Sequence, residues 1–277
     1  AVDSVPLIVA EQLGYFRDEG VAVELVLFKS QLYRESALQT GAVDGSVSDL
    51  INALGARQRG FAVRVTSGTA GRFALLAAPG SPHRSLEQWQ APGQIRTGLL
   101  ENSVVYYLSE RMLQRAGVDP SRIELVSSPD VPVRLEMLLA GRLEAACLPE
   151  PLTRLALAGG ASLIVESFGA EETPGVLLFT EAAIRGKEGQ IRGAYRAYDR
   201  AAALLSGAGL TPPLREAIVR RGEFPPAAAQ TMQLPAYSPA RLPSRALVAD
   251  VHGWMLTKGL LTGPVAYEAL TDPRFTE

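Results

Sequence analysis

Two stretches that lie far apart in the chain share one pattern. The first is ALQTGAVDG at Ala37–Gly45, and the second is LLAGRLEAA at Leu138–Ala146. In each, an apolar helix reaches a glycine, and a carboxylate with small residues then leads into a strand. Glycine suits the position after a helix end because it adopts the left-handed backbone conformation without steric cost. The repeat predicts two similarly built α/β lobes in one chain.

Strand-like and helix-like patterns alternate as far as Gly175–Thr180 (GVLLFT), which itself predicts a strand. Val21–Phe28 (VAVELVLF) is β-branched and alternating, and it also predicts a strand. The remaining chain predicts helices separated by the proline-rich joints LTPPL, EFPPA and RLPSR. Such alternation favours a mostly parallel sheet with helices on its faces. We expect lobe 1 to comprise residues 1–78 and 180–277 and lobe 2 residues 79–179, although a single longer doubly wound sheet would give almost the same pattern.

Composition excludes several classes of protein. Among the 277 residues, 27 lysines and arginines nearly balance 29 aspartates and glutamates, so nothing indicates a nucleic-acid partner. The two histidines, His83 and His252, are too few and too far apart for a convincing metal site. The single cysteine, Cys147, lies in an apolar strand pattern and predicts a core residue rather than a nucleophile. We therefore expect no metal, no cofactor and no catalytic residues.

Several motifs carry a resemblance to a known family. PLIVAEQLGYFRDEGVAVELVLFKS is followed by ESALQTGAVDGSVSD, and later by SLEQWQAPGQIRTG, ENSVVYYLSERMLQRAGVD, ELV and MLLAGRLEAACLPEP. In this order they resemble the nitrate, sulfonate, taurine and thiamine-pyrimidine-precursor branch of the periplasmic solute-binding proteins of ABC transporters. The resemblance implies a two-lobed type II periplasmic-binding-protein fold, in which each lobe is a mainly parallel sheet flanked by helices and two strands cross between the lobes. Family members usually begin with a strand before the first helix, whereas only AVDSV precedes Pro6 here.

The resemblance also implies a function. The protein would capture a small organic solute, such as a sulfonate, an aromatic compound or a pyrimidine-like vitamin precursor, in the cleft between the lobes and deliver it to the transmembrane permease. It would be a monomer in the periplasm or at the outer face of the cytoplasmic membrane, with lipid anchoring left open. The alternative is an enzyme of the same fold that acts on a small aromatic acid, as in the menaquinone pathway. Glu101, Asp130 or Glu150 would then serve as its acid or base.

Lobe 1 offers candidate ligand contacts in the loops after its predicted strands. Ser30 and Gln31 offer donors to an anionic or carbonyl group. For Asp49, capping of the following helix is an equally good interpretation, and Arg72 is either a ligand clamp or a solvated turn residue. The lobe 1 candidates are Ser4, Val5, Ser30, Gln31, Ser46, Ser48, Asp49, Thr69 and Arg72.

Lobe 2 offers candidates at the starts of its helices. Ser103 stands where the resemblance implies a hydroxyl-rich turn that contacts anions, and it is the strongest single candidate. Capping of the helix by Asn102 or Ser103 is compatible with that role, because a cap leaves other N–H groups available. The carboxylates of Glu101, Asp130 and Glu150 argue against a strongly anionic ligand such as nitrate and leave room for amine, amidine or ring N–H donors.

Overall fold

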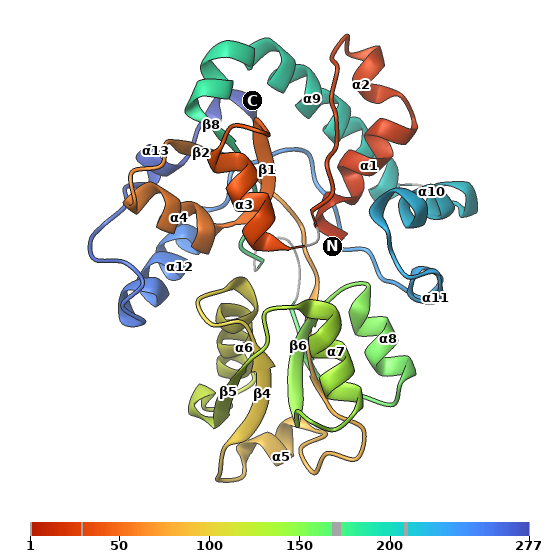
Figure 1. Cartoon of the computed structure of the whole chain (residues 1–277), viewed down its shortest axis with the longest axis vertical. Coiled ribbons are helices and arrows are strands. Elements are labelled where there is room, and N and C mark those ends of the chain that lie inside the picture. Colours follow the sequence, from red (N-terminus) through yellow and green to blue (C-terminus); the bar gives the residue numbers. More distant parts are fainter. Residues whose placement is uncertain (1, 29, 168–172, 208–209, 277) are drawn as a thin grey trace. The chain divides into compact units, whose positions relative to one another are not determined.

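The computed structural model describes residues 2–28, 30–167, 173–207 and 210–276. The chain divides into two compact units (Figure 1). The larger unit comprises Asp3–Ala70, Ala170–Phe224 and Pro235–Glu277, and the smaller unit comprises Ala1–Val2, Gly71–Gly169 and Pro225–Leu234. Pro225–Leu234, which was expected in lobe 1, groups with the smaller unit. The divisions at 70/71 and 169/170 also fall earlier in the chain than the expected 78/79 and 179/180. The reason is strand pairing, because β3 (Phe73–Ala77) pairs within the smaller unit and β8 (Gly175–Thr180) within the larger one.

The sheet of the larger unit has β8 at its centre. Its strand order is β1-β8-β2, with β1 at Gly45–Asp49 and β2 at Val63–Gly68. β8 runs antiparallel to both neighbours. The expectation of a mainly parallel sheet is therefore wrong for this unit. The cause is that β8, which brings the chain back from the smaller unit, enters between β1 and β2 in the opposite direction.

Helices cover the sheet of the larger unit. Helix α4 packs against all three strands, while α9 packs against β8 and binds β2 through a hydrogen bond of 2.6 Å between the Tyr195 and Thr66 hydroxyls. The helices that follow β8 confirm the helical tail predicted from the sequence. The helices of this unit are α1 (Val5–Gln12), α2 (Tyr15–Asp18), α3 (Gln31–Gln39), α4 (Leu50–Gln58), α9 (Glu181–Gly207), α10 (Pro212–Gly222), α12 (Arg245–Thr257) and α13 (Tyr267–Leu270).

The sheet of the smaller unit is also mixed, with the strand order β5-β4-β6-β3-β7. β4 is parallel to β5 and β6, which confirms parallel pairing for that half of the sheet, whereas β3 is antiparallel to both β6 and β7. The remaining elements are β4 (Ile95–Leu99), β5 (Ile123–Ser127), β6 (Ala145–Pro149), β7 (Ser162–Glu166), α5 (Leu86–Gln90), α6 (Val104–Arg115), α7 (Val131–Leu139), α8 (Leu152–Ala158) and α11 (Pro226–Ala229). Short 3-10 helices lie at Val2–Ser4, Pro120–Arg122 and Pro273–Phe275.

Alternate residues of β3 and β6 supply the core of the smaller unit on the two faces of its sheet. Leu76 and Leu148 pack with Leu138 of α7, so α7 and α8 cover one face. Cys147 points to the other face, where its thiol meets Ser109 of α6. Both faces are thus covered, which explains why these strands read as continuous apolar runs in the sequence.

The repeated sequence pattern forms the same helix-to-strand joint in both units. Gly41 and Gly141, with φ of 74° and 68°, follow the ends of α3 and α7. The N–H group after each glycine donates to the carbonyl of Ala37 or Met137, at 2.9 Å in both cases. This bond is the signature of a Schellman motif, which turns the chain out of a helix. β1 and β6 then begin at corresponding positions, and this confirms the joint that the sequence predicts.

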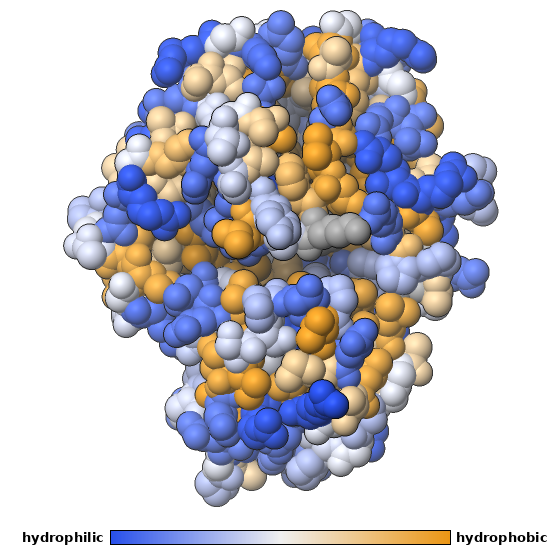
Figure 2. Space-filling model, in the orientation of Figure 1, coloured by the Kyte–Doolittle hydropathy of each residue, from blue (hydrophilic) through white to orange (hydrophobic). Residues whose placement is uncertain are grey.

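The segment Val21–Phe28 does not form the strand that the sequence predicts. It has no regular secondary structure and pairs with no strand in the described part of the chain. The Leu25 carbonyl accepts a hydrogen bond of 2.5 Å from Arg221 of α10. Val26 and Leu27 are 50% and 45% exposed, and Figure 2 shows apolar side chains gathered along this part of the larger unit. Strand propensity is present, but a strand also needs a hydrogen-bonded neighbour.

Among the described residues, no helix combines the length and the apolar character required to cross a lipid bilayer.

Candidate functional site

Polar residues gather at one edge of the sheet in the larger unit. β1 ends at Asp49, which is the register partner of Gly175 at the start of β8. On the other side of β8, the Thr69 N–H donates to the Gly175 carbonyl at 2.8 Å. The structure therefore brings the candidates Ser48, Asp49 and Thr69 to one edge, on either side of Gly175.

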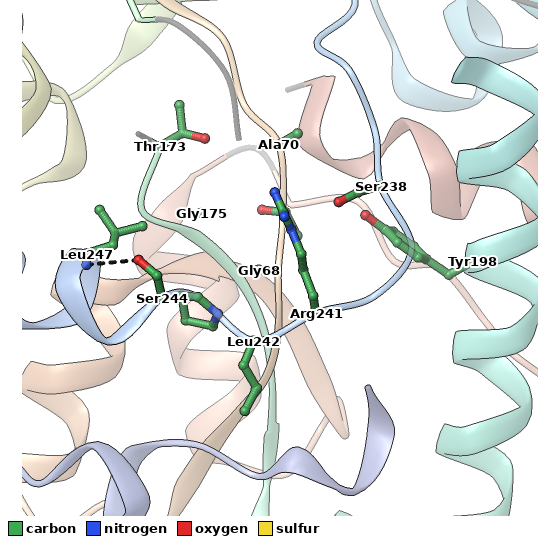
Figure 3. A pocket seen from close by; sticks show the side chains of 12 residues that line it. Gly68, Ala70, Thr173, Gly175, Tyr198, Ser238, Arg241, Leu242, Ser244 and Leu247 are labelled. Atoms are coloured by element: carbon green, nitrogen blue, oxygen red, sulfur yellow. Dashed lines mark hydrogen bonds between the residues drawn. The ribbon is translucent and has the colours of Figure 1, made fainter. Parts of the chain in front are cut away.

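A small pocket lies beside Thr69 in the larger unit (Figure 3). Its volume of about 30 Å³ accommodates a small polar group rather than a whole organic solute. Among the described residues of the lining, none carries a carboxylate and one, Arg241, carries a charge. The lining residues are Gly68, Thr69, Ala70, Thr173, Gly175, Tyr198, Ser238, Arg241, Leu242, Pro243, Ser244 and Leu247.

The Thr69 hydroxyl is the most informative group in this pocket. Thr69 is 4% exposed, and its Oγ1 atom has no hydrogen-bond partner within the described residues. Leaving a buried hydroxyl unpaired costs about 1–3 kcal/mol, so a partner from beyond the described residues is expected. Gly175 keeps the space open, because a Cβ atom there would lie 2.5 Å from the same hydroxyl oxygen.

Arg241 supplies the positive charge, and the sequence reasoning missed it. Its carbonyl accepts from the Gly68 N–H at 2.7 Å, so the end of β2 fixes its backbone. In Figure 3 its side chain extends along the pocket toward Ala70. Arg241 lies in the proline-rich joint RLPSR, which the sequence presents only as a break between helices. An arginine between prolines is a weak signal that could have drawn attention to it.

Asp49 lies at the start of α4 and binds Asn52 twice. Its Oδ1 atom accepts from the Asn52 N–H at 2.9 Å, and its Oδ2 atom accepts from the Asn52 side-chain Nδ2 at 2.7 Å. The Asn52 Oδ1 atom in turn accepts from the Gln31 Nε2 at 2.9 Å. Burial raises the pKa of Asp49 to about 6, although the hydrogen bond from the Asn52 N–H opposes the shift. Asp49 is therefore the helix cap that the sequence allows, and Asn52 joins it to Gln31.

The other candidates of the larger unit make local contacts. Ser30 caps α3 by accepting from the Tyr33 N–H at 3.3 Å, and the Ser46 hydroxyl donates to the Val47 carbonyl at 3.0 Å. Ser4 precedes α1 without a capping hydrogen bond from its side chain. Val5 is fully buried, so its side chain belongs to the core.

In the smaller unit, the carboxyl ends of the parallel strands β4, β5 and β6 carry the second set of candidates. The Ser103 hydroxyl, at the start of α6, donates to the Leu100 carbonyl at 2.5 Å instead of capping the helix. Asp130 caps α7 through the Val133 N–H at 3.0 Å and is exposed. Glu101 and Asn102 lie in the exposed turn before α6, where Asn102 adopts a φ of 58°. Asparagine tolerates this left-handed conformation better than most residues.

Two neighbouring ion pairs occupy the same edge. Arg72 binds Glu166 through both oxygens, at 2.8 and 2.9 Å from its Nη2 atom, so it is neither a solvated residue nor an uncommitted ligand clamp. Glu150 is fully buried and accepts from the Arg154 Nε at 2.6 Å, while its Oε2 atom has no side-chain hydrogen-bond partner in the described chain. Burial raises the pKa of Glu150, while the hydrogen bond and charge of Arg154, the charge of Arg72 and the backbone N–H of Gln233 oppose that shift. Spacing alone could not show that residues 72 and 166 meet.

The described residues contain no cluster of three or more histidine, cysteine, aspartate or glutamate side chains that could hold a metal ion. Cys147 is fully buried, and burial raises the pKa of its thiol to about 11. The Cys147 thiol is therefore a core group, as the sequence predicts.

Comparison with protein families gives one decisive match. The profile described as NMT1/THI5 like matches residues 1–205. The chain belongs to the NMT1/THI5-like family. No curated protein sequence matches the chain.

Solved structures similar to this NMT1/THI5-like protein share its fold. The zinc-bound ligand-binding component of an ABC-type import system from Staphylococcus aureus has a TM-score of 0.81 at 14% identity, covering 100% of this chain and 95% of that one. The alkanesulfonate-binding protein SsuA from Xanthomonas axonopodis, bound to MOPS, has a TM-score of 0.76 at 19% identity, with 97% and 95% covered. The desulfurization enzyme DSZB has a TM-score of 0.67 at 16% identity, with 98% and 94% covered. At these identities the likeness establishes the periplasmic-binding-protein fold predicted from the sequence.

Proposed function

We propose that the protein is the extracytoplasmic solute-binding component of an ABC importer and that its solute carries a sulfonate-like head group. The observation that carries the proposal is the pocket beside Thr69, which combines a buried unpaired hydroxyl with an arginine and has no carboxylate among its described lining residues. A charge-assisted hydrogen bond from an arginine favours an anionic oxygen, and the hydroxyl adds a second donor. The binding functions named for two of the structural neighbours support the same class of activity.

The proposal also includes the partners and the location expected from the sequence. A solute-binding component works outside the cytoplasm, where it delivers its ligand to the transmembrane subunits of a permease. The component itself is either free or anchored to the membrane by a lipid. The candidates in the smaller unit, Ser103, Asp130 and Glu150, stay predictions for further solute contacts. The aromatic and pyrimidine-like solutes remain alternatives within the same class of function.

A direct test measures binding of methanesulfonate by calorimetry and by the rise in melting temperature. Binding should raise the melting temperature of the wild type in a saturable way. Thr69→Val and Arg241→Met should each weaken binding by about 10-fold or more, because a hydrogen bond to a charged group contributes about 1.5–3 kcal/mol. Arg245→Met is the matched control, because Arg245 is 67% exposed and pairs with Glu268. Equal binding by all variants would refute the assignment of this pocket.

An enzyme of the same fold is the second candidate. The observation that favours it is Glu150, a fully buried carboxyl with a raised pKa and one oxygen without a side-chain partner. Such a group is a typical general acid or base. Prolonged incubation with the bound solute distinguishes the two functions. A solute-binding protein returns the compound unchanged, whereas its consumption by the wild type but not by Glu150→Gln would establish catalysis.

A further inference from the structure

The chain of hydrogen bonds from Asp49 through Asn52 to Gln31 fixes which end of each amide faces its neighbour. An ionised carboxylate only accepts hydrogen bonds, so the Asn52 amide must turn its NH₂ group toward Asp49. The Asn52 carbonyl oxygen then faces Gln31 and requires the NH₂ group of that residue. Within the described residues, the Gln31 carbonyl oxygen has no hydrogen-bond partner. Gln31 therefore presents an acceptor, where the sequence suggests a donor.

A proton on Asp49 reverses this order. The Oδ1 atom of Asp49 stays bound to the Asn52 N–H, so the proton taken from solvent resides on Oδ2. A protonated Oδ2 donates, and the Asn52 amide must then turn its carbonyl oxygen toward it. Asn52 next directs its NH₂ group to Gln31, which turns its own carbonyl inward. The NH₂ group of Gln31 is left facing outward as a donor.

We propose that Asn52 is the positioning residue that sets whether Gln31 offers an acceptor or a donor to the solute, and that protonation of Asp49 switches between the two. This inference rests on the proposed function, and it adds the sequence candidate Gln31 to the solute contacts proposed there. At neutral pH the site selects solutes with an N–H or O–H donor opposite Gln31. In mild acid that preference is lost.

The surroundings of Asp49 place the switch in an accessible pH range. Asp49 is 6% exposed, and its burial is the main reason that its carboxyl holds a proton more tightly than a carboxyl in water. The charged groups that act on it belong to α3, where Arg34 favours the ionised form and Glu35 opposes it. The pKa of about 6 means that both orders of the relay are populated within ordinary buffer conditions.

NMR of the ¹⁵N-labelled 277-residue chain between pH 4.5 and pH 7.5 tests the relay through its side-chain amides. The NH₂ signals of Gln31 and Asn52 should move together with one midpoint near pH 6. Asp49→Asn mimics the protonated residue and keeps the cap, so its Gln31 and Asn52 signals should stay at their acid positions throughout. Asn52→Ser breaks the link and should abolish the pH response of Gln31. If the NH₂ signals of Gln31 and Asn52 do not shift with pH in the wild type, the relay is refuted.

A binding measurement connects the relay to the solute. Taurine and 1-propanesulfonate are nearly the same size, but only taurine carries a donor at the end opposite its sulfonate. The preference of the wild type for taurine at pH 7.5 should fall by about tenfold in Asp49→Asn, which corresponds to about one hydrogen bond. An unchanged preference would overturn the role of Gln31 in selection. If the amide signals switch and neither compound binds, the proposed function is wrong while the relay itself stands.

Discussion

Replacing Asp49 with asparagine tests the electrostatics of the larger unit most sharply. Asparagine caps a helix as well as aspartate does, so the variant keeps the start of α4 while it removes the charge and holds Asn52 and Gln31 in the order of the protonated state. In the wild type, burial raises the Asp49 pKa from 3.8 to about 6. The folded protein therefore holds this proton more tightly than the unfolded chain does. Its contribution to stability is fully present below pH 3.8 and is lost as the pH rises through 6.

The magnitude follows from the same two pKa values. At 1.36 kcal/mol for each pH unit, the difference between 3.8 and about 6 corresponds to about 3 kcal/mol. The Asp49→Asn variant cannot lose this contribution. Because part of this difference already appears below pH 4, the free energy of unfolding of the variant minus that of the wild type should increase by about 2 kcal/mol between pH 4 and pH 7.5. Most of the increase should occur below pH 6.5.

Urea denaturation at a series of pH values measures this difference. The matched control is Asp130→Asn, because Asp130 caps α7 with the same bond to the third residue but is exposed. The effect of burial is the amount by which the pH-dependent change in unfolding free energy for Asp49→Asn exceeds that for Asp130→Asn. A difference at Asp49 that is flat with pH, or that follows the Asp130 control, would refute the reasoning.

Three further predictions concern other parts of the chain. Arg154→Met should lower the free energy of unfolding by about 3–5 kcal/mol at pH 7, because it leaves the buried Glu150 carboxylate without its side-chain donor. The loss should shrink in acid, and urea denaturation at pH 7 and in acid measures it. Gly175→Ala should abolish methanesulfonate binding, because the new Cβ atom would lie 2.5 Å from the Thr69 hydroxyl oxygen and displace it. Gly253→Ala, in an open position on α12, should bind normally and gain about 0.5–1 kcal/mol of stability. Iodoacetamide should modify Cys147 at pH 8 only as fast as the protein unfolds, and rapid labelling of the native protein would contradict its burial.

The sequence predicts well those features that depend on neighbouring residues. The joints at Gly41 and Gly141 and the cap at Asp49 all arise from residues within one turn of each other. Helix ends and caps follow local backbone geometry, which local sequence encodes. The helical tail after residue 180 is confirmed for the same reason, since its apolar spacing is a local signal.

Features that depend on distant partners could not be predicted in the same way. The ion pair of Arg72 with Glu166 joins the residue before β3 to the last residue of β7, and nothing near Arg72 in the sequence indicates it. Arg241 reaches the pocket because the end of β2 binds its backbone. The direction of β8, and with it the mixed sheet, depends on where the returning chain inserts. These contacts are set by tertiary structure, on which single-sequence patterns carry little information.

The contacts of Asn52 could be predicted in part, because one is local in sequence and the other is not. The spacing of Asp49 and Asn52 is the local signal of a capped helix start. The hydrogen bond to Gln31 spans two helices and could be found only in the structure. The sequence therefore hints at the role of Asn52 only by placing a polar residue in the first turn of α4, close to the candidates Ser48 and Asp49.

The segment Val21–Phe28 has a consequence for handling the protein. It is rich in strand-forming residues and carries backbone groups that no neighbouring strand engages among the described residues. An extended segment with unpaired backbone groups is a template for pairing with another chain, as an edge strand is, and proteins usually protect such segments with charged side chains. Concentrated solutions should therefore begin to associate here, where the 50% exposed Val26 offers an apolar contact. A lysine at this position, Val26→Lys, is the substitution we expect to keep the protein dispersed at the concentrations that crystallisation and NMR require.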